Sequence, residues 1–348
     1  MLRMMILRPV PSSRHDFTPA DAASAGPIPA VPAWLRRAVP DAQGLAGYSV
    51  EDVAITAGAA LGALDAVVRR AEKWAGAWRQ RLALSAAAVT ARQAGRVEDE
   101  AALRDTFAFS GTQDGLSGST TLGPAGLFLL VWRRLAARPV EDLLTAKNLG
   151  AVAEAFGYAR DAEALGELAD ELRRLAAGGA VGQLTGAFLA AERYGFGRFV
   201  GAWLADALLA RRLGWAHAVP LLGTEVTLGG GPARIRRSAI VSPAVGIETE
   251  SDGAKSLLAA QARAALRAID LSAELGRRAE KLLAVAPKLR AKGADTVVQK
   301  LLSCDAMVAS DPVAGISDRG LRRLFDRLVE LDAVRELSGR PAFRIYGL

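Results

Sequence analysis

The sequence contains one cysteine and two histidines in 348 residues, so it is poor in the side chains that ligate transition metals or pair as nucleophile and base. A single cysteine excludes a disulfide framework and a cysteine-rich zinc site. The two histidines, His15 and His217, are far apart in the sequence, which argues against a histidine-based metal centre or catalytic dyad. We therefore expect a protein that is not an enzyme and that uses no metal or cofactor.

Long apolar runs are also missing. The charge-free apolar stretch most worth checking, residues 53–64, ends at Asp65 and is far shorter than the roughly 20 residues that a membrane-spanning helix needs. The apolar run within residues 1–8 is too short for a signal peptide. Together with the single free cysteine, these features predict a cytoplasmic protein without a membrane partner.

Aromatic residues make up 6% of the chain and hydrophobic residues 51%, which predicts a core of alanine, leucine and valine and excludes global disorder. The formal net charge is +7. A basic balance permits an acidic partner such as nucleic acid. Spread over 348 residues, the same charge also fits a mildly basic surface without such a partner.

Helical periodicity dominates from residue 48 onward. Residues 1–47 are rich in proline and small residues and predict a disordered leader, with a short docking turn near residues 33–37. Ser49 is suited to cap a helix that begins at Val50. Apolar residues recur at helical spacing in the segments 53–68, 75–89, 97–109, 125–137, 140–156, 162–176, 182–193, 199–213 and 255–285. The sequence therefore predicts a mainly α protein with a multi-helix body at 48–285.

Two segments interrupt the helical pattern. Residues 110–124 are rich in glycine, serine and threonine and predict a loop. Residues 214–253 contain three consecutive glycines, Gly229 to Gly231, between two stretches typical of strands, which predicts either a loose hairpin or a long irregular loop. The glycines lack the lysine and hydroxyl residue of a phosphate-binding loop, so we interpret them as a turn.

The last part of the chain, residues 286–348, has a different pattern. A helix is predicted at 295–307, a turn at 311–315, and a basic helix from Ser317 to Asp332 whose apolar residues lie on one face. Residues 333–346 then predict a strand, a turn and a strand. This order resembles a winged helix-turn-helix, in which the basic helix would enter the DNA groove. The candidate DNA-binding residues are Arg319, Arg322, Arg323, Arg340 and Arg344.

The same helix also supports a second interpretation. Its exposed face carries Asp326 and Glu330, and two carboxylates would repel DNA phosphates. The segment before the turn lacks a clear second helix, and winged helices also dock proteins. Two functions therefore stay open: a non-enzymatic DNA-associated or regulatory protein with duplex DNA as its partner, and a protein-interaction or scaffold protein whose C-terminal module docks a protein.

Four acidic residues gather near the predicted helix at 97–109: Glu98, Asp99, Glu100 and Asp105. Paired carboxylates can hold a divalent metal or transfer protons. Acidic residues in a first helical turn are also favourable with the helix dipole, and we favour this structural interpretation.

Other conspicuous residues also have two interpretations. Trp74 and Trp78 lie four apart, beside two arginines, and form either part of the core or a nucleic-acid surface; we favour the core. Cys304 adjoins an apolar helix face and is predicted to be a buried structural thiol. His217 is predicted to be a packed or surface histidine rather than a catalyst.

Several stretches of the sequence are distinctive enough to indicate a family. They are Trp74–Leu84, Gly95–Asp105, Leu127–Leu135, Leu204–Trp215, Val219–Leu222, Leu282–Val298, Arg322–Val329 and Val334–Leu348. Together they resemble an uncharacterised bacterial family of about this length, classed as a domain of unknown function, over residues 50–348. The loops near 110–122 and 224–250 depart from it. The resemblance implies one set of domains that occur together, and it brings no activity, cofactor or site residue.

Overall fold

The computed structural model describes residues 31–41, 44–109, 122–159, 161–226, 243–340 and 343–348. These residues form a mainly helical protein with a small antiparallel sheet near the C-terminus, as the sequence predicts. The body contains the helices α1 (Ala33–Ala38), α2 (Val50–Arg69), α3 (Ala75–Gln93), α4 (Glu100–Phe109), α5 (Gly123–Ala137), α6 (Val140–Leu143), α7 (Ala146–Ala155), α8 (Ala162–Ala176), α9 (Ala180–Arg193), α10 (Arg198–Leu213) and α11 (Pro243–Val285), with 3-10 turns η1 (Gly44–Gly47) and η3 (Leu222–Thr224). The C-terminal module contains η5 (Ala286–Lys288), α12 (Ala294–Ser303), β1 (Met307–Val308), α13 (Asp318–Glu330), β2 (Arg335–Glu336) and β3 (Ile345–Gly347).

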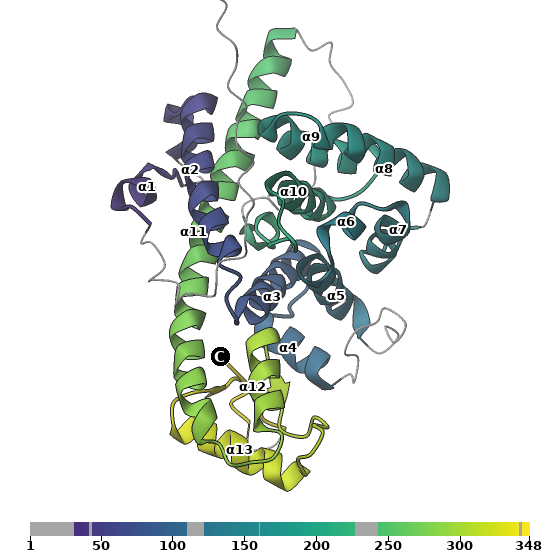
Figure 1. Cartoon of the computed structure of the whole chain (residues 1–348). Helices are drawn as coiled ribbons and strands as arrows, with labels where there is room; N and C mark the ends of the chain where they lie inside the picture. The colour runs from purple at the N-terminus through teal and green to yellow at the C-terminus, as the bar shows by residue number, and fades with distance from the viewer. Residues whose placement is uncertain (1–30, 42–43, 110–121, 160, 227–242, 341–342) are drawn as a thin grey trace, which may run out of the picture.

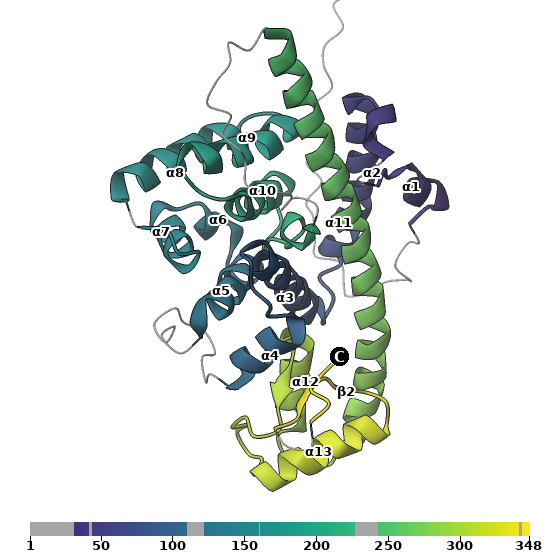
Figure 2. The ribbon, with the colours of Figure 1, turned by 180° about the vertical axis from the view of Figure 1, so that it is seen from behind.

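The long helix α11 connects the two parts of the molecule. It runs along one side of the body with α2 packed against it, while α3 to α10 lie on its other side (Figure 1). Its C-terminal end reaches α13, which crosses the far end of the molecule (Figure 2). The module is therefore placed at the end of the body, next to α3, α4 and α11.

Local capping signals set the helix starts. Ser49 accepts a hydrogen bond from the Asp52 N–H at 3.1 Å and caps α2, as predicted. The predicted helix at 140–156 is divided into α6 and α7, because Thr145 takes an extended conformation and caps α7 with its side chain. Such a cap satisfies backbone N–H groups that would otherwise lack partners, so it favours a new helix start.

The structure has a helix at the docking turn predicted near residues 33–37 of the leader, and it differs from the predicted loop at 214–253. Residues 33–38 form α1, whose Leu35 is buried and whose Arg36 pairs with Asp270 of α11 at 2.5 Å. The earlier part of the leader, through residue 30, lies outside the described residues. Helix α11 begins at Pro243, within the segment 214–253 that was predicted as a loop or hairpin. The glycines 229–231 and most of the loop 110–124 also lie outside the described residues.

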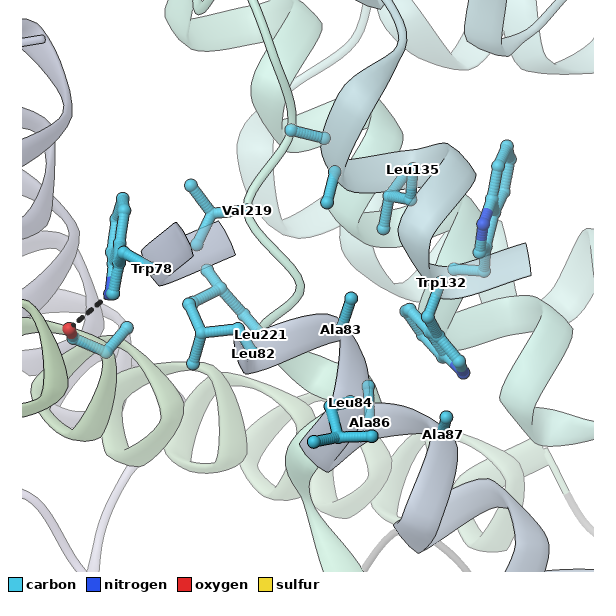
Figure 3. Packing of buried hydrophobic residues seen from close by; sticks show 14 of the residues in the cluster. Trp78, Leu82, Ala83, Leu84, Ala86, Ala87, Trp132, Leu135, Val219 and Leu221 are labelled. Atoms are coloured by element: carbon cyan, nitrogen blue, oxygen red, sulfur yellow. Dashed lines mark hydrogen bonds between the residues drawn. The ribbon is translucent and has the colours of Figure 1, made fainter. Parts of the chain in front are cut away.

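The core is built from small residues and a few large rings. Figure 3 shows Ala83, Ala86 and Ala87 of α3, all fully buried, among the leucines of the neighbouring elements. Small side chains let helix axes approach closely. The high alanine content of the chain therefore allows its helices to pack tightly. Trp78 lies in this core and donates its indole N–H to the Ala268 carbonyl at 2.8 Å. Trp74 is also buried, so both tryptophans belong to the core.

The Trp132 ring packs so closely on Gly223 of η3 that this position has no space for a side chain. A Cβ atom at Gly223 would lie 2.3 Å from the Trp132 ring, and Trp132 is fully buried with its N–H bonded to Thr90 at 2.9 Å. We expect Gly223→Ala to lower the free energy of unfolding by about 1–3 kcal/mol, because a tightly packed ring has no space to move into. Urea denaturation measures this, with Gly62→Ala as the control, since open space surrounds Gly62. Equal stability of both variants would contradict the prediction.

The C-terminal sheet has the strand order β1-β3-β2, with both pairs antiparallel. The prediction of one helix at 295–307 was wrong at its end, because α12 stops at Ser303 and Met307 pairs with Tyr346 in the sheet. The Phe325 ring of α13 stacks on Tyr346 with ring centroids 4.4 Å apart. This contact joins the helix to the sheet and forms the centre of the module.

Candidate functional site

Helix α13 lies at the end of the molecule (Figure 1). Its apolar face is buried against the module through Leu321, Leu324, Phe325 and Leu328. Ser317 caps the helix by accepting from the Gly320 N–H at 3.2 Å. The opposite face is exposed, and its first half carries the predicted arginines Arg319, Arg322 and Arg323.

Three more cations lie in the loop before α12. Lys288, Arg290 and Lys292 are exposed. The loop is packed on the turn that leads into α13, since a Cβ atom at Gly293 would lie 2.8 Å from the Ala314 carbonyl oxygen. Sequence reasoning missed these cations, although their alternation with apolar residues at 288–292 was a visible signal. The tertiary structure places Lys292 beside Gly315, in the turn that leads into α13.

The second half of α13 is nearly neutral. Arg327 pairs with Glu330 at 2.9 Å, and Asp326 is exposed beside them. Asp326 and Glu330, the acidic residues that weaken the DNA interpretation, lie in the C-terminal half of the helix, with Asp326 one turn from Arg322. Asp318 is also exposed, at the start of the helix next to Arg319.

The structure does not place the other two predicted arginines with the first three. Arg340 forms an ion pair with Asp105 of α4, and next to it the Phe343 ring meets Phe109 edge-on at 5.7 Å. Arg344 lies 3.7 Å from the Glu336 carboxylate. Both guanidinium groups thus have acidic partners, and Arg340 and Phe343 contact α4 of the body.

A buried carboxylate links the module to the body. Asp305 is almost fully buried and forms ion pairs with Arg81 of α3 and, at 2.8 Å, with Arg104 of α4. Burial raises the pKa of Asp305, but the charges of Arg81, Arg104 and Arg133 lower it by a larger amount. The pKa of Asp305 is therefore below its ordinary value. Sequence reasoning did not single out Asp305, because its partners lie more than 200 residues away.

The model of a protein family described as Protein of unknown function (DUF1403) matches residues 20–348. The chain belongs to this family. No curated protein and no solved structure matches it. The match confirms the resemblance to a family of unknown function and extends over nearly the whole chain.

The acidic cluster of this DUF1403 protein has structural contacts. The Asp99 carboxylate accepts from the Ala102 N–H at 2.8 Å at the start of α4, Glu98 pairs with Arg96 at 3.3 Å, and Asp105 holds Arg340. Within the described ranges, no group of three or more histidine, cysteine, aspartate or glutamate side chains could hold a metal ion. The described part of the DUF1403 chain also contains no helix with the length and apolar character that crossing a membrane requires.

The prediction that Cys304 is buried was wrong. Helix α12 ends one residue earlier, and Cys304 continues in an extended conformation that exposes its thiol. His217 is partly buried, and its backbone forms an isolated bridge with Pro139. Burial lowers the pKa of His217, the charge of Arg79 lowers it further, and Glu141 partly opposes them. His217 is thus a packed histidine, as predicted.

Proposed function

We propose that this DUF1403 protein is a non-enzymatic, DNA-associated or regulatory protein of the cytoplasm that binds duplex DNA through its C-terminal module. The observation that carries the proposal is the set of exposed arginines in the first half of α13, with the exposed Lys292 beside the turn that leads into this helix. Clustered arginine and lysine neutralise phosphates and release counterions, and arginine also reads guanine edges in the major groove. The proposed contact residues are Lys288, Arg290, Lys292, Arg319, Arg322 and Arg323.

The order of elements in the module supports the same proposal. A helix, a strand, a second helix and a hairpin, with the strand order β1-β3-β2, resemble a winged helix. In that fold, the helix before the hairpin lies in the DNA groove and its N-terminal half meets the bases. Residues 309–316 form a short turn where a helix-turn-helix has the helix that precedes its recognition helix. Arg340 and Arg344 are left out of the proposed surface because of their acidic partners.

Gel-shift titrations of duplex DNA at two salt concentrations test this proposal. We expect the triple variant Arg319→Ala, Arg322→Ala, Arg323→Ala to bind at least about tenfold more weakly, because three charge-assisted contacts are lost. The slope of log K against log salt should fall by about 1 for each phosphate contact removed.

The matched control removes three exposed arginines from α1, α3 and α10: Arg37, Arg92 and Arg198. This control should bind DNA nearly as the wild type does. Absence of a shift at low salt, or equal binding by both triple variants, would overturn the proposal.

One feature favours the second candidate function, in which the module docks a protein. The second half of α13 combines the Arg327–Glu330 ion pair with Val329, which is 40% exposed. Mixed charges around an apolar residue are typical of a protein interface rim. Two results together would favour this candidate. The protein would show no salt-dependent affinity for DNA, and a protein that copurifies with the wild type would be lost from the Val329→Asp variant.

A further inference from the structure

A large cleft lies at the junction of the body and the C-terminal module. Its volume is about 910 Å³, which is within the range of small-molecule sites. Its walls come from α3, α4, α5, the connection to α6 with Asp142, the end of α12 and the segment 304–312. Neither the DNA surface proposed above nor the acidic cluster at 98–105 uses this cleft.

The cleft walls carry an excess of positive charge. The cationic side chains are Arg104, Arg133, Arg134, Arg138 and Lys300, and the carboxylates are Asp142, Asp305 and Asp311. Among these, Asp305 is already engaged by Arg104 and by Arg81 from behind the wall, and Asp311 accepts from the Val308 N–H at 3.2 Å. The carboxylates of the cleft are therefore too few to neutralise its cations.

Arg133 shows this excess most clearly. Its guanidinium lies 3.8 Å above the centre of the Phe107 ring, and its Nε–H is buried without a hydrogen-bond partner among the described residues. A buried donor without a partner is costly, and a buried charge more so. Burial is also the main reason why the pKa of Arg133 lies below its ordinary value. The charge of Asp305 offsets this effect only in part, and an acidic group in the cleft would supply further negative charge and the acceptor that the Nε–H lacks.

Two further cations line the same cleft. Arg138 is exposed and Lys300 is half-buried, and neither forms an ion pair within the described part of the chain. They contrast with Arg134, whose Nε donates to Asn148. The remaining wall is apolar and includes Phe107, Leu130 and Met307.

We propose that this cleft binds a small organic acid, with a phosphate or carboxylate group held by Arg133, Arg138 and Lys300 and an apolar, ring-sized body against Phe107, Leu130 and Met307. Arginine is suited to bidentate contact with either acid group, and lysine adds a point charge. The apolar wall requires more than an inorganic anion. Phosphate and carboxylate share this chemistry, and the probes below separate them.

Cys304 offers a site-specific measurement, because it is the one cysteine of the chain and its exposed thiol lies on the cleft wall. The full-length protein is alkylated with iodoacetamide, a neutral reagent, and the rate is followed by mass spectrometry. The probes are phenyl phosphate, benzoate, inorganic phosphate and benzyl alcohol. We expect phenyl phosphate or benzoate to slow alkylation about tenfold at ten times its dissociation constant. The stronger of these two identifies the acid group.

The variants Arg138→Gln and Lys300→Gln remove cations that support no contact in the described core, so both should fold. Each is expected to raise the half-protecting concentration by about tenfold. Arg37→Gln, on α1, is the matched control and should leave protection unchanged. Arg133→Gln is a further variant, whose folding must be checked because the side chain also packs on Phe107.

Several results would overturn the proposal. Protection by benzyl alcohol as strong as by phenyl phosphate would exclude a role for the acid group. Protection by inorganic phosphate at equal concentration would exclude the apolar body. Equal protection in Arg37→Gln, Arg138→Gln and Lys300→Gln would indicate a nonspecific effect. The experiment contains no DNA and changes no residue of α13, so its outcome is independent of the DNA-binding proposal.

Discussion

Replacing Asp305 with alanine is expected to lower the free energy of unfolding by about 3–5 kcal/mol. Asp305 is almost fully buried, and its carboxylate pairs with Arg81 and Arg104. Its removal leaves both guanidinium groups, which are themselves mostly buried, without a counter-charge. Because Arg81 lies on α3 and Arg104 on α4, the variant should loosen the module from the body.

The matched control is Asp270→Ala, which breaks the ion pair between Asp270 and Arg36. That pair is 2.5 Å long, but its side chains are 54% and 43% exposed, so the expected loss is at most about 1 kcal/mol. Urea denaturation with an unchanged m-value measures both variants. A loss below about 1 kcal/mol for Asp305→Ala would show that the buried pairs do not hold the module in place.

Asp305 also predicts a direction for the pH dependence of stability. Its folded-state pKa is lower than its unfolded-state pKa, so its stabilising contribution is complete above the unfolded value and is lost as the pH falls through the folded value. We expect acid unfolding of the wild type to be steeper than that of Asp305→Asn below about pH 4. Parallel acid titrations of both proteins by circular dichroism would contradict this assignment.

The second large effect is expected at Asp206 of α10. This carboxylate is fully buried and accepts hydrogen bonds from Leu221 at 2.8 Å, from Leu222 at 3.1 Å and from the Gly223 N–H. Asp206→Ala leaves these backbone donors without acceptors in the core, and each costs about 1 kcal/mol or more. We expect a loss of at least about 3 kcal/mol in urea denaturation.

Asp161 provides the control for Asp206. It also accepts from two backbone N–H groups, at 3.0 and 3.2 Å, but it lies on the surface at the start of α8. Loss of an exposed helix cap costs about 1 kcal/mol, so Asp161→Ala should be clearly milder. Equal losses for Asp161→Ala and Asp206→Ala would mean that burial adds nothing to the cost.

The pH dependence due to Asp206 has the opposite sign to that of Asp305. Burial raises the pKa of Asp206 to about 7, although its hydrogen bonds with backbone N–H groups oppose the rise. Between about pH 4 and pH 7 the folded state binds the proton more tightly than the unfolded chain, so stability falls as the pH rises. The fall should be on the order of a few kcal/mol and should be absent in Asp206→Asn. A wild-type curve that is flat between pH 4 and 7 would refute this assignment.

Local features of the sequence were sufficient for most of the helices. The caps Ser49 and Ser317 and the apolar face of α13 act within one or two turns, so they can be recognised without the rest of the chain. The strand β1 could not be predicted, because two residues are too short to show an alternating pattern and their pairing with β3 lies far along the sequence. The end of α12 and the exposure of Cys304 were missed for the same reason.

The sequence by itself determined a mainly helical, alanine-rich protein with few metal-binding and nucleophilic side chains and a C-terminal module that carries arginine. Only the tertiary structure decided which charges meet. It paired Arg340 with Asp105, 235 residues away, placed Arg81 on Asp305 across 224 residues, and left the cleft cations short of carboxylates. Helix periodicity and capping are short-range effects, whereas ion pairing and burial depend on which helix faces pack together. For this reason the helices could be predicted from the sequence, and the contacts of the candidate sites could not.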